Sequence, residues 1–176
     1  KDDAYVIQLA NMNVARILYE RSLIVYMNVE EGKKTEAQKN EEMGLVNKAL
    51  SLYRKIPMDS PYYDQSYYEM VWIYIRRAQY KDALNAIEIM IASMPESLYA
   101  PEAQLTKAEL LGKLDKQREA GTMYQSIVSN WQDVVDTFDK LIKLTSGKRA
   151  SAINKEAMDK VKNLPIVAIK WLKQER

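Results

Sequence analysis

The sequence predicts an all-α fold, for three reasons. The 176 residues include only five Gly and five Pro, too few for the many turns of a β-sandwich or β-barrel. Long stretches are rich in Ala, Leu, Met, Lys, Glu and Gln, which favour the helical state. Large apolar residues recur at helical spacing, as they do between Tyr67 and Tyr74. A chain that is 47% hydrophobic and 28% charged is typical of a globular domain and not of a disordered tail.

The clearest internal unit covers residues 64–97. Its apolar residues lie on one helix face in the first half and on one helix face again in the second half: Tyr67, Met70, Val71 and Tyr74, then Tyr80, Ala83, Ile87 and Met90. Ala83 is small, as expected where two helices cross, because a larger side chain would hold the backbones apart. Pro95 lacks a backbone donor and is expected to end the second helix. The unit is therefore predicted to be a helical hairpin.

A second copy of this hairpin follows downstream. Glu119 and Ala120 repeat the Asp82-Ala83 pair at an offset of 37 residues, which predicts a further hairpin over residues 101–134. Gln132 stands where the proline is expected, so this copy is imperfect.

An upstream copy is predicted over about residues 8–63, with Ala49 as the counterpart of Ala83. Its two helices are separated by an insertion over about residues 21–43. Residues 30–42 of the insertion are charged and nearly free of apolar side chains. A longer helical hairpin with a solvated tip is the favoured interpretation of this segment, and an arm that contacts a partner is the alternative.

Residues 135–176 are predicted to form C-terminal helices that cover the last hairpin, because an open end of a repeat stack would expose core. An apolar stripe from Val134 to Ile142 begins this region, and Ser146-Gly147 gives a stop signal. A further amphipathic helix is expected to carry Ile153, Ala157, Val161 and Leu164 on one face. The apolar tail, residues 166–172, either folds back on the repeats or belongs to a continuing chain.

The unit at residues 64–97 resembles a tetratricopeptide repeat, in which large residues come early, Ala stands at position 20 and Pro at position 32. The resemblance implies an α-solenoid of three helix-turn-helix repeats with C-terminal capping helices, forming a single domain over residues 1–176. Short strings such as Asp59-Ser60-Pro61-Tyr62 and the run from Leu164 to Trp171 also resemble envelope-associated tetratricopeptide proteins of gliding and predatory δ-proteobacteria. That likeness implies a bacterial protein of the periplasm or cell envelope that helps to assemble other proteins, such as those of a cell-envelope or motility complex; a cytoplasmic location is the alternative.

Repeats of this family bind partners in a groove lined by their first helices, and the resemblance carries this role to twelve positions of the chain. They are Met12, Arg16, Tyr19 and Glu20 in the first repeat, Gln65, Tyr68, Trp72, Ile75 and Arg76 in the second, and Leu105, Glu109 and Lys113 in the third. An aromatic pair beside Arg has the composition of a binding hot spot. For Tyr68 and Trp72, however, core packing is the competing interpretation, since two aromatics four residues apart often pack together.

The composition also narrows the function. The chain has no His and no Cys, so Cys-based zinc sites, catalytic thiols and a Ser-His-Asp triad are excluded. A net charge of +2 with interspersed signs gives no strong field aimed at nucleic acid. There is no Gly-rich phosphate loop and no apolar run that could span a membrane. No catalytic residues, cofactor or metal are therefore expected.

The sequence thus predicts a protein–protein interaction scaffold or adaptor and not an enzyme. A peptide or a helix segment of another protein would bind in the groove of the repeats. The alternative is a self-assembling repeat module, a homo-oligomer without a peptide ligand, joined through an exposed edge of the repeats or through the apolar tail. The chain begins at Lys1 without an initiator Met, so a fragment or a processed form is expected.

Overall fold

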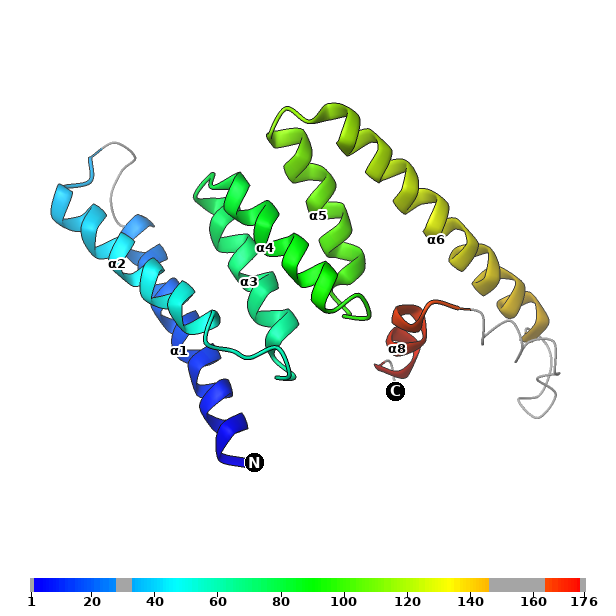
Figure 1. The fold of residues 1–176 in the computed structure, drawn as a ribbon, viewed down its shortest axis with the longest axis horizontal. Helices are drawn as coiled ribbons and strands as arrows, with labels where there is room; N and C mark the ends of the chain where they lie inside the picture. The colour runs from blue at the N-terminus through cyan, green and yellow to red at the C-terminus, as the bar shows by residue number, and fades with distance from the viewer. Residues whose placement is uncertain (1, 28–32, 146–163, 175–176) are drawn as a thin grey trace. The chain divides into compact units, whose positions relative to one another are not determined.

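A computed structural model describes residues 2–27, 33–145 and 164–174 of the chain. These residues form helices joined by short turns, and none of them lies in a strand, which confirms the predicted all-α class. The chain divides into two compact units, Lys1–Ser93 and Met94–Arg176. Figure 1 shows the helices of both units pairing as neighbours along the chain. No described helix combines the length and the hydrophobicity needed to cross a membrane.

The first unit begins with a long hairpin of α1 (Asp2–Met27) and α2 (Glu36–Tyr53). Thr35 caps α2: its hydroxyl accepts a hydrogen bond from the Gln38 amide, and the Gln38 side chain accepts one from the Thr35 amide at 2.9 Å. This reciprocal arrangement satisfies backbone donors that a helix start leaves unpaired. The predicted insertion, residues 21–43, therefore lengthens both arms of the hairpin wherever the structure describes it.

A shorter hairpin of α3 (Tyr63–Arg76) and α4 (Tyr80–Ser93) completes the first unit. Ala83 is fully buried where the two helices pack, as its small size predicts. The turn between them passes through Ala78 in the left-handed region, with φ of 55°. Beside it the Gln79 amide donates to the Tyr74 carbonyl at 2.9 Å, which ends α3 in the hydrogen-bonding pattern of a Schellman motif.

The second unit contains α5 (Ala100–Lys113), α6 (Gln117–Thr145) and α8 (Ile166–Gln174). The structure corrects the predicted boundary at residues 134/135, because α6 runs through it without a break. The physical reason is Gln132: where a proline would have ended the helix, this residue keeps its backbone donor. The stripe predicted to form a separate capping helix therefore lies on the second arm of the hairpin.

The apolar tail folds back within the second unit. Leu164 and Ala168 form a buried cluster with Val134 of α6, and Trp131 and Phe138 pack against it. Lys170 donates to the Glu96 carbonyl at 2.8 Å, in the turn that precedes α5. Of the two interpretations of the tail, the structure supports packing on the helices. The helix expected around Ile153, Ala157 and Val161 lies outside the described residues.

Two kinds of turn recur with a spacing of 37 residues: the turn that precedes a hairpin and the turn between its two helices. Ser60 and Ser97 are both buried, and each hydroxyl accepts a hydrogen bond at 3.1 Å from the amide two residues later. The Gln79-to-Tyr74 bond likewise has its counterpart from Lys116 to Leu111, also 2.9 Å. The sequence offset between Ala83 and Ala120 is thus also a period of the backbone.

The same period changes the predicted upstream register. Four of the five buried residues of α2 match the buried residues of α4 at an offset of 37: Val46, Ala49, Leu50 and Tyr53 against Ala83, Ala86, Ile87 and Met90. Val46, and not Ala49, is therefore the counterpart of Ala83. The sequence comparison missed this correspondence because it matched Ala to Ala, whereas the helices preserve the spacing of buried positions and not the residue type.

Candidate functional site

The structure corrects two of the residues predicted to face a partner. Met12 is 1% exposed and Tyr68 is 8% exposed, so both belong to the core of the first unit. Trp72, one turn beyond Tyr68 on α3, is 43% exposed. The two rings meet edge to face, with centroids 6.0 Å apart and planes at 87°. Packing is thus the role of Tyr68, and this contact supports a Trp72 side chain that reaches the surface.

Arg16 was predicted as a partner contact, but it joins α1 to α3. Its Nε donates to both carboxylate oxygens of Glu69, at 3.1 and 3.0 Å, and its Nη2 lies 2.5 Å from Oε1. The Tyr53 hydroxyl of α2 donates to the same carboxylate at 2.7 Å. Burial raises the pKa of Tyr53 well above its usual range, and the hydrogen bond to Glu69 raises it further. Glu69 therefore connects three helices and fixes the faces that flank the site.

A cleft of about 590 Å³ opens in the first unit between α1, α2 and the end of α3. Two of its lining residues, Tyr19 and Arg76, were predicted for the groove, and the others were not: Ser22, Leu23, Met27, Glu42, Val46, Arg77 and Ala78. Leu23, Met27 and Val46 give the cleft an apolar surface. The resemblance implied only groove positions on the first helix of each repeat, so Ser22, Leu23, Met27 and Glu42, which lie within the predicted insertion at residues 21–43, were not among them.

Arg76 lies over the ring of Tyr19, 5.8 Å from its centroid. This places a guanidinium against an aromatic face, an arrangement that holds the charge in position while leaving it exposed to solvent. Burial raises the pKa of the Tyr19 hydroxyl, and the nearby Arg76 charge opposes that increase. Among the residues that the structure describes, no carboxylate lies within ion-pair distance of Arg76.

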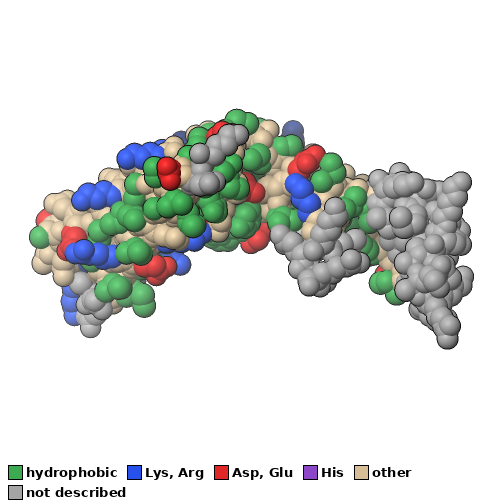
Figure 2. All heavy atoms as spheres, turned by 90° about the horizontal axis from the view of Figure 1, so that it is seen from below, with side chains coloured by type: hydrophobic (Ala, Val, Ile, Leu, Met, Phe, Trp, Pro, Cys, Tyr) green, Lys and Arg blue, Asp and Glu red, His purple; other side chains and the backbone are tan. Residues whose placement is uncertain are grey.

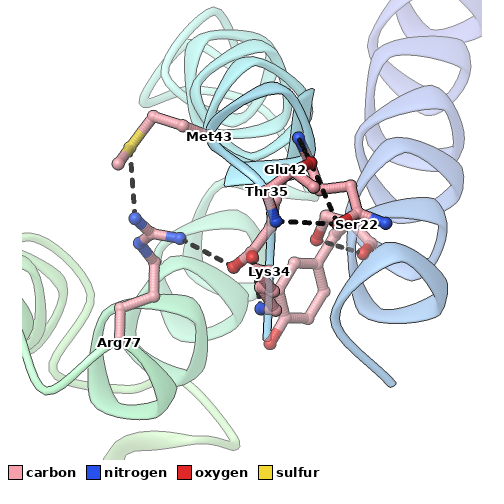
Figure 3. A network of polar contacts seen from close by, with 8 residues as sticks. Ser22, Lys34, Thr35, Glu42, Met43 and Arg77 are labelled. Carbon is pink, nitrogen blue, oxygen red and sulfur yellow. Dashed lines mark hydrogen bonds and ion pairs between the residues drawn. The ribbon is translucent and has the colours of Figure 1, made fainter. Parts of the chain in front are cut away.

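The neighbouring Arg77 is tied to α2 (Figure 3). Its Nη1 lies 3.4 Å from Glu42 Oε1, and its Nη2 lies 3.1 Å from the sulfur of Met43. Lys34 donates to the other oxygen of Glu42 at 2.7 Å. The Glu42 side chain is only 17% exposed. The charged stretch over residues 30–42 is therefore not entirely a solvated tip. Its last residue, Glu42, forms a largely buried ion pair with Arg77, and both residues line the cleft.

The charges around the cleft sum to an excess of positive charge. Of the charged residues that line the cleft, Arg77 is paired with Glu42, and Arg76 adds a further cation with an aromatic ring below it. On the face shown in Figure 2, by contrast, Lys or Arg and Asp or Glu side chains are interspersed among hydrophobic ones. The cleft thus combines an apolar surface with a local cationic edge, a combination that holds an anionic group next to an apolar side chain.

The remaining predicted site residues lie on exposed or half-buried positions. Glu20 is exposed on α1, and Gln65 and Ile75 are half-buried on α3. Leu105, Glu109 and Lys113 are exposed on α5 in the second unit, four residues apart along one helix face. The second unit has its own cavity of about 450 Å³, between α5, α6 and the segment from Leu164 to Val167. Among the described residues, no three Asp or Glu side chains gather in a way that could hold a metal ion.

Comparison with known proteins found no matching family model, no matching curated protein and no matching solved structure, so the geometry of the chain itself carries the interpretation of the site.

Proposed function

We propose that this chain is a protein-binding module whose first unit takes a segment of a partner protein into the cleft between α1, α2 and α3. The segment carries an Asp or Glu next to one or two large apolar side chains. Its carboxylate binds Arg76, and its apolar side chains fill the space lined by Leu23, Met27 and Val46. The chain acts by binding, in keeping with a sequence that has no His and no Cys.

One observation carries the proposal: Arg76 is held over Tyr19 at an apolar cleft and has no carboxylate partner among the described residues. A guanidinium stacked on an aromatic ring loses little side-chain freedom when it binds a carboxylate, because its orientation is already restricted. Arg77 is less able to bind a carboxylate of a partner, since it is already paired with Glu42. The positive charge of Arg76 thus favours a negatively charged group on the ligand.

The mechanism depends on a cleft that exists before the partner arrives. The contacts of Glu69 with Arg16 and Tyr53 hold α1, α2 and α3 together, and the contacts of Arg77 with Glu42 hold the end of α3 against α2. A partner segment therefore orders onto a surface that does not itself need ordering, which lowers the entropic cost of binding. Arg and aromatic side chains of this kind contribute most of the affinity at many interfaces.

The test is a selection of random peptides on the purified full chain, followed by calorimetric titration of the enriched peptides. We expect enriched peptides to carry an acidic residue beside large apolar ones. Arg76→Glu should weaken their binding at least tenfold, which is about 1.4 kcal/mol, because it replaces an attractive charge with a repulsive one. Met27→Asp should also weaken binding, because Met27 lines the apolar part of the cleft and is 79% exposed, so the change leaves the core intact.

Arg118→Glu is the matched control, since Arg118 is an exposed Arg on α6 in the second unit. It makes the same change in net charge and should leave the affinity within about twofold of the parent, as surface changes away from a site usually do. Enriched peptides without an acidic residue, or equal affinities for Arg76→Glu and Arg118→Glu, would show that the cleft is not the binding site.

A further inference from the structure

One helix face of the first unit lacks a covering element. Along α1, apolar residues recur at alternating intervals of three and four: Ile7, Ala10, Val14, Ile17 and Ile24, with the single charged residue Arg21 in the same series. All six are exposed, and Ile7, Ile17 and Ile24 reach 60%, 66% and 58%. Val6, beside the series, is also 66% exposed. We name the six residues of the series the α1 stripe.

The α1 stripe is distinct from the face that α1 uses within its own unit. Met12, Ala15 and Ser22 are buried at 1%, 0% and 1% on the inner face of the helix. The stripe follows the heptad spacing by which two helices pack along their length, and from Ile7 to Ile24 it extends over about 26 Å at 1.5 Å per residue. A contiguous apolar surface of this length marks an interaction site in most soluble proteins.

We infer that the α1 stripe pairs with the α1 stripe of a second copy of this chain, in antiparallel orientation. This inference goes beyond the proposed function, because the stripe is a different surface from the cleft. A two-fold pairing brings each position against the one for which the two residue numbers sum to 31. Ile7 then lies opposite Ile24 of the other copy, and Val14 lies opposite Ile17. The stripe thus meets itself with apolar residues opposed, as an isologous interface requires.

The charged residues on this face of α1 favour the antiparallel orientation and favour a second copy of the chain as the binding partner. In the antiparallel pairing Arg21 lies opposite the small Ala10, so its side chain keeps its exposed contact with Glu41 at 3.4 Å. Glu20, which flanks the stripe, lies level with Asn11 of the other copy and close to Asn13, so no like charges are opposed. A parallel pairing would place Arg21 against Arg21 within the seam, which is unfavourable. A second copy therefore satisfies both the apolar pattern and the charge pattern of the face.

The only other long exposed stripe on a described helix is on α6, and part of it is already covered. Val128, Val135 and Ile142 are 65%, 50% and 61% exposed, but Trp131 and Phe138 of the same series pack against the cluster formed with α8. The α1 stripe has no such cover among the described residues. It is therefore the better surface for a closed dimer, whereas pairing of an α1 stripe with an α6 stripe would build an open chain of copies.

The test is the mass of the full chain by analytical ultracentrifugation over a wide range of concentration. The expected result is a dimer with twice the 20.4 kDa mass of the chain. Ile17→Glu, at an exposed position in the centre of the stripe, should raise the dimer dissociation constant at least tenfold with unchanged helicity. Val128→Glu, the matched change on α6, should leave the dimer intact. A parent that is monomeric throughout would overturn the inference, as would a dimer that Val128→Glu dissociates and Ile17→Glu does not.

Cysteine pairing tests the orientation without relying on a destabilising charge. The chain has no Cys of its own, so Val14→Cys and Ile17→Cys chains can be mixed and oxidised. Antiparallel pairing predicts that disulfides form mainly between the two different chains, because these positions are opposed. Disulfides that form mainly between identical chains would show a parallel or unrelated contact and contradict the inference.

Discussion

At the scale of single residues, the Glu69 carboxylate of α3 links three helices of the first unit. It accepts hydrogen bonds from Arg16 on α1 and Tyr53 on α2, although its side chain is 23% exposed. Charge-assisted bonds of this kind are stronger than neutral ones, but partial exposure to solvent reduces their net contribution. The contact is also one that the sequence did not predict, because 53 residues separate Arg16 from Glu69.

Glu69→Gln keeps the size of the side chain and removes its charge. We expect the free energy of unfolding, measured by urea denaturation, to fall by about 1–2 kcal/mol, because the Arg16 guanidinium loses its charged acceptor. Glu109→Gln, an exposed control on α5, should change it by less than about 0.5 kcal/mol. Equal effects of the two substitutions would show that the contact with Arg16 does not stabilise the fold.

The raised pKa of Tyr53 predicts a loss of stability in alkaline solution. Burial and the bond to Glu69 favour the protonated hydroxyl in the folded state, whereas in the unfolded state a tyrosine titrates near about pH 10. The Tyr53 hydroxyl therefore contributes fully to stability below about pH 10. This contribution is lost as the pH rises further, because deprotonation of the tyrosine then lowers the free energy of the unfolded state more than that of the folded state. Burial raises the pKa of Tyr19 and Tyr67 as well, so both add to the same loss.

Tyr53→Phe separates the contribution of Tyr53 from the others. The variant should be less stable than the parent at pH 8, because Glu69 loses a donor, and its melting temperature should fall less steeply between about pH 9 and 11. Melting curves followed by circular dichroism at several pH values give both quantities. Parallel pH profiles for the parent and the variant would show that the ionisation of Tyr53 is not linked to folding.

At the scale of the elements, the sequence predicted the hairpins well wherever apolar spacing and turn residues agreed. The hairpin of α3 and α4 lies where Tyr67 to Met90 predicted it, because its buried residues have helical spacing. The length of α6 was not predicted. For residues 30–42 the favoured interpretation was a longer helical hairpin with a solvated tip; α2 begins within this segment at Glu36, but Lys34 and Glu42 form an ion pair at 2.7 Å that is largely shielded from solvent. For α6, the repeat pattern predicted that the helix ends near residue 134, although the proline expected to end it is replaced by Gln132.

The continuity of α6 predicts the effect of restoring that proline. Gln132→Pro should destabilise the second unit by about 3 kcal/mol or more, because proline removes a helical hydrogen bond and clashes with the preceding turn. Gln132→Ala should change stability by less than about 0.5 kcal/mol, since Gln132 bonds only Asp136 on an exposed face. Denaturant unfolding followed by helical circular dichroism measures both. Equal stability of the two variants would mean that α6 is interrupted near residue 132.

At the scale of the whole molecule, two surfaces of the first unit have proposed roles: the cleft is proposed to bind a partner segment, and the α1 stripe is proposed to pair two copies of the chain. The expected class of function rests on absences and on a family resemblance and stays a prediction. Two of the residues predicted for the groove, Tyr19 and Arg76, line the cleft. The sequence could not separate Tyr68, which is buried, from Trp72, which is exposed, because the exposure of a side chain depends on contacts between helices. The tetratricopeptide resemblance and the envelope location stay predictions.

The most direct test of the central claim is amide chemical-shift mapping of the full chain as a selected acidic peptide is titrated in. The account predicts that the largest changes fall on residues that line the cleft, such as Tyr19, Leu23, Val46 and Arg76, and that Arg76→Glu abolishes them at the same peptide concentration. Changes concentrated on α5 or on the α1 stripe, with the amides of the cleft unaffected, would contradict the claim that the cleft is the binding site.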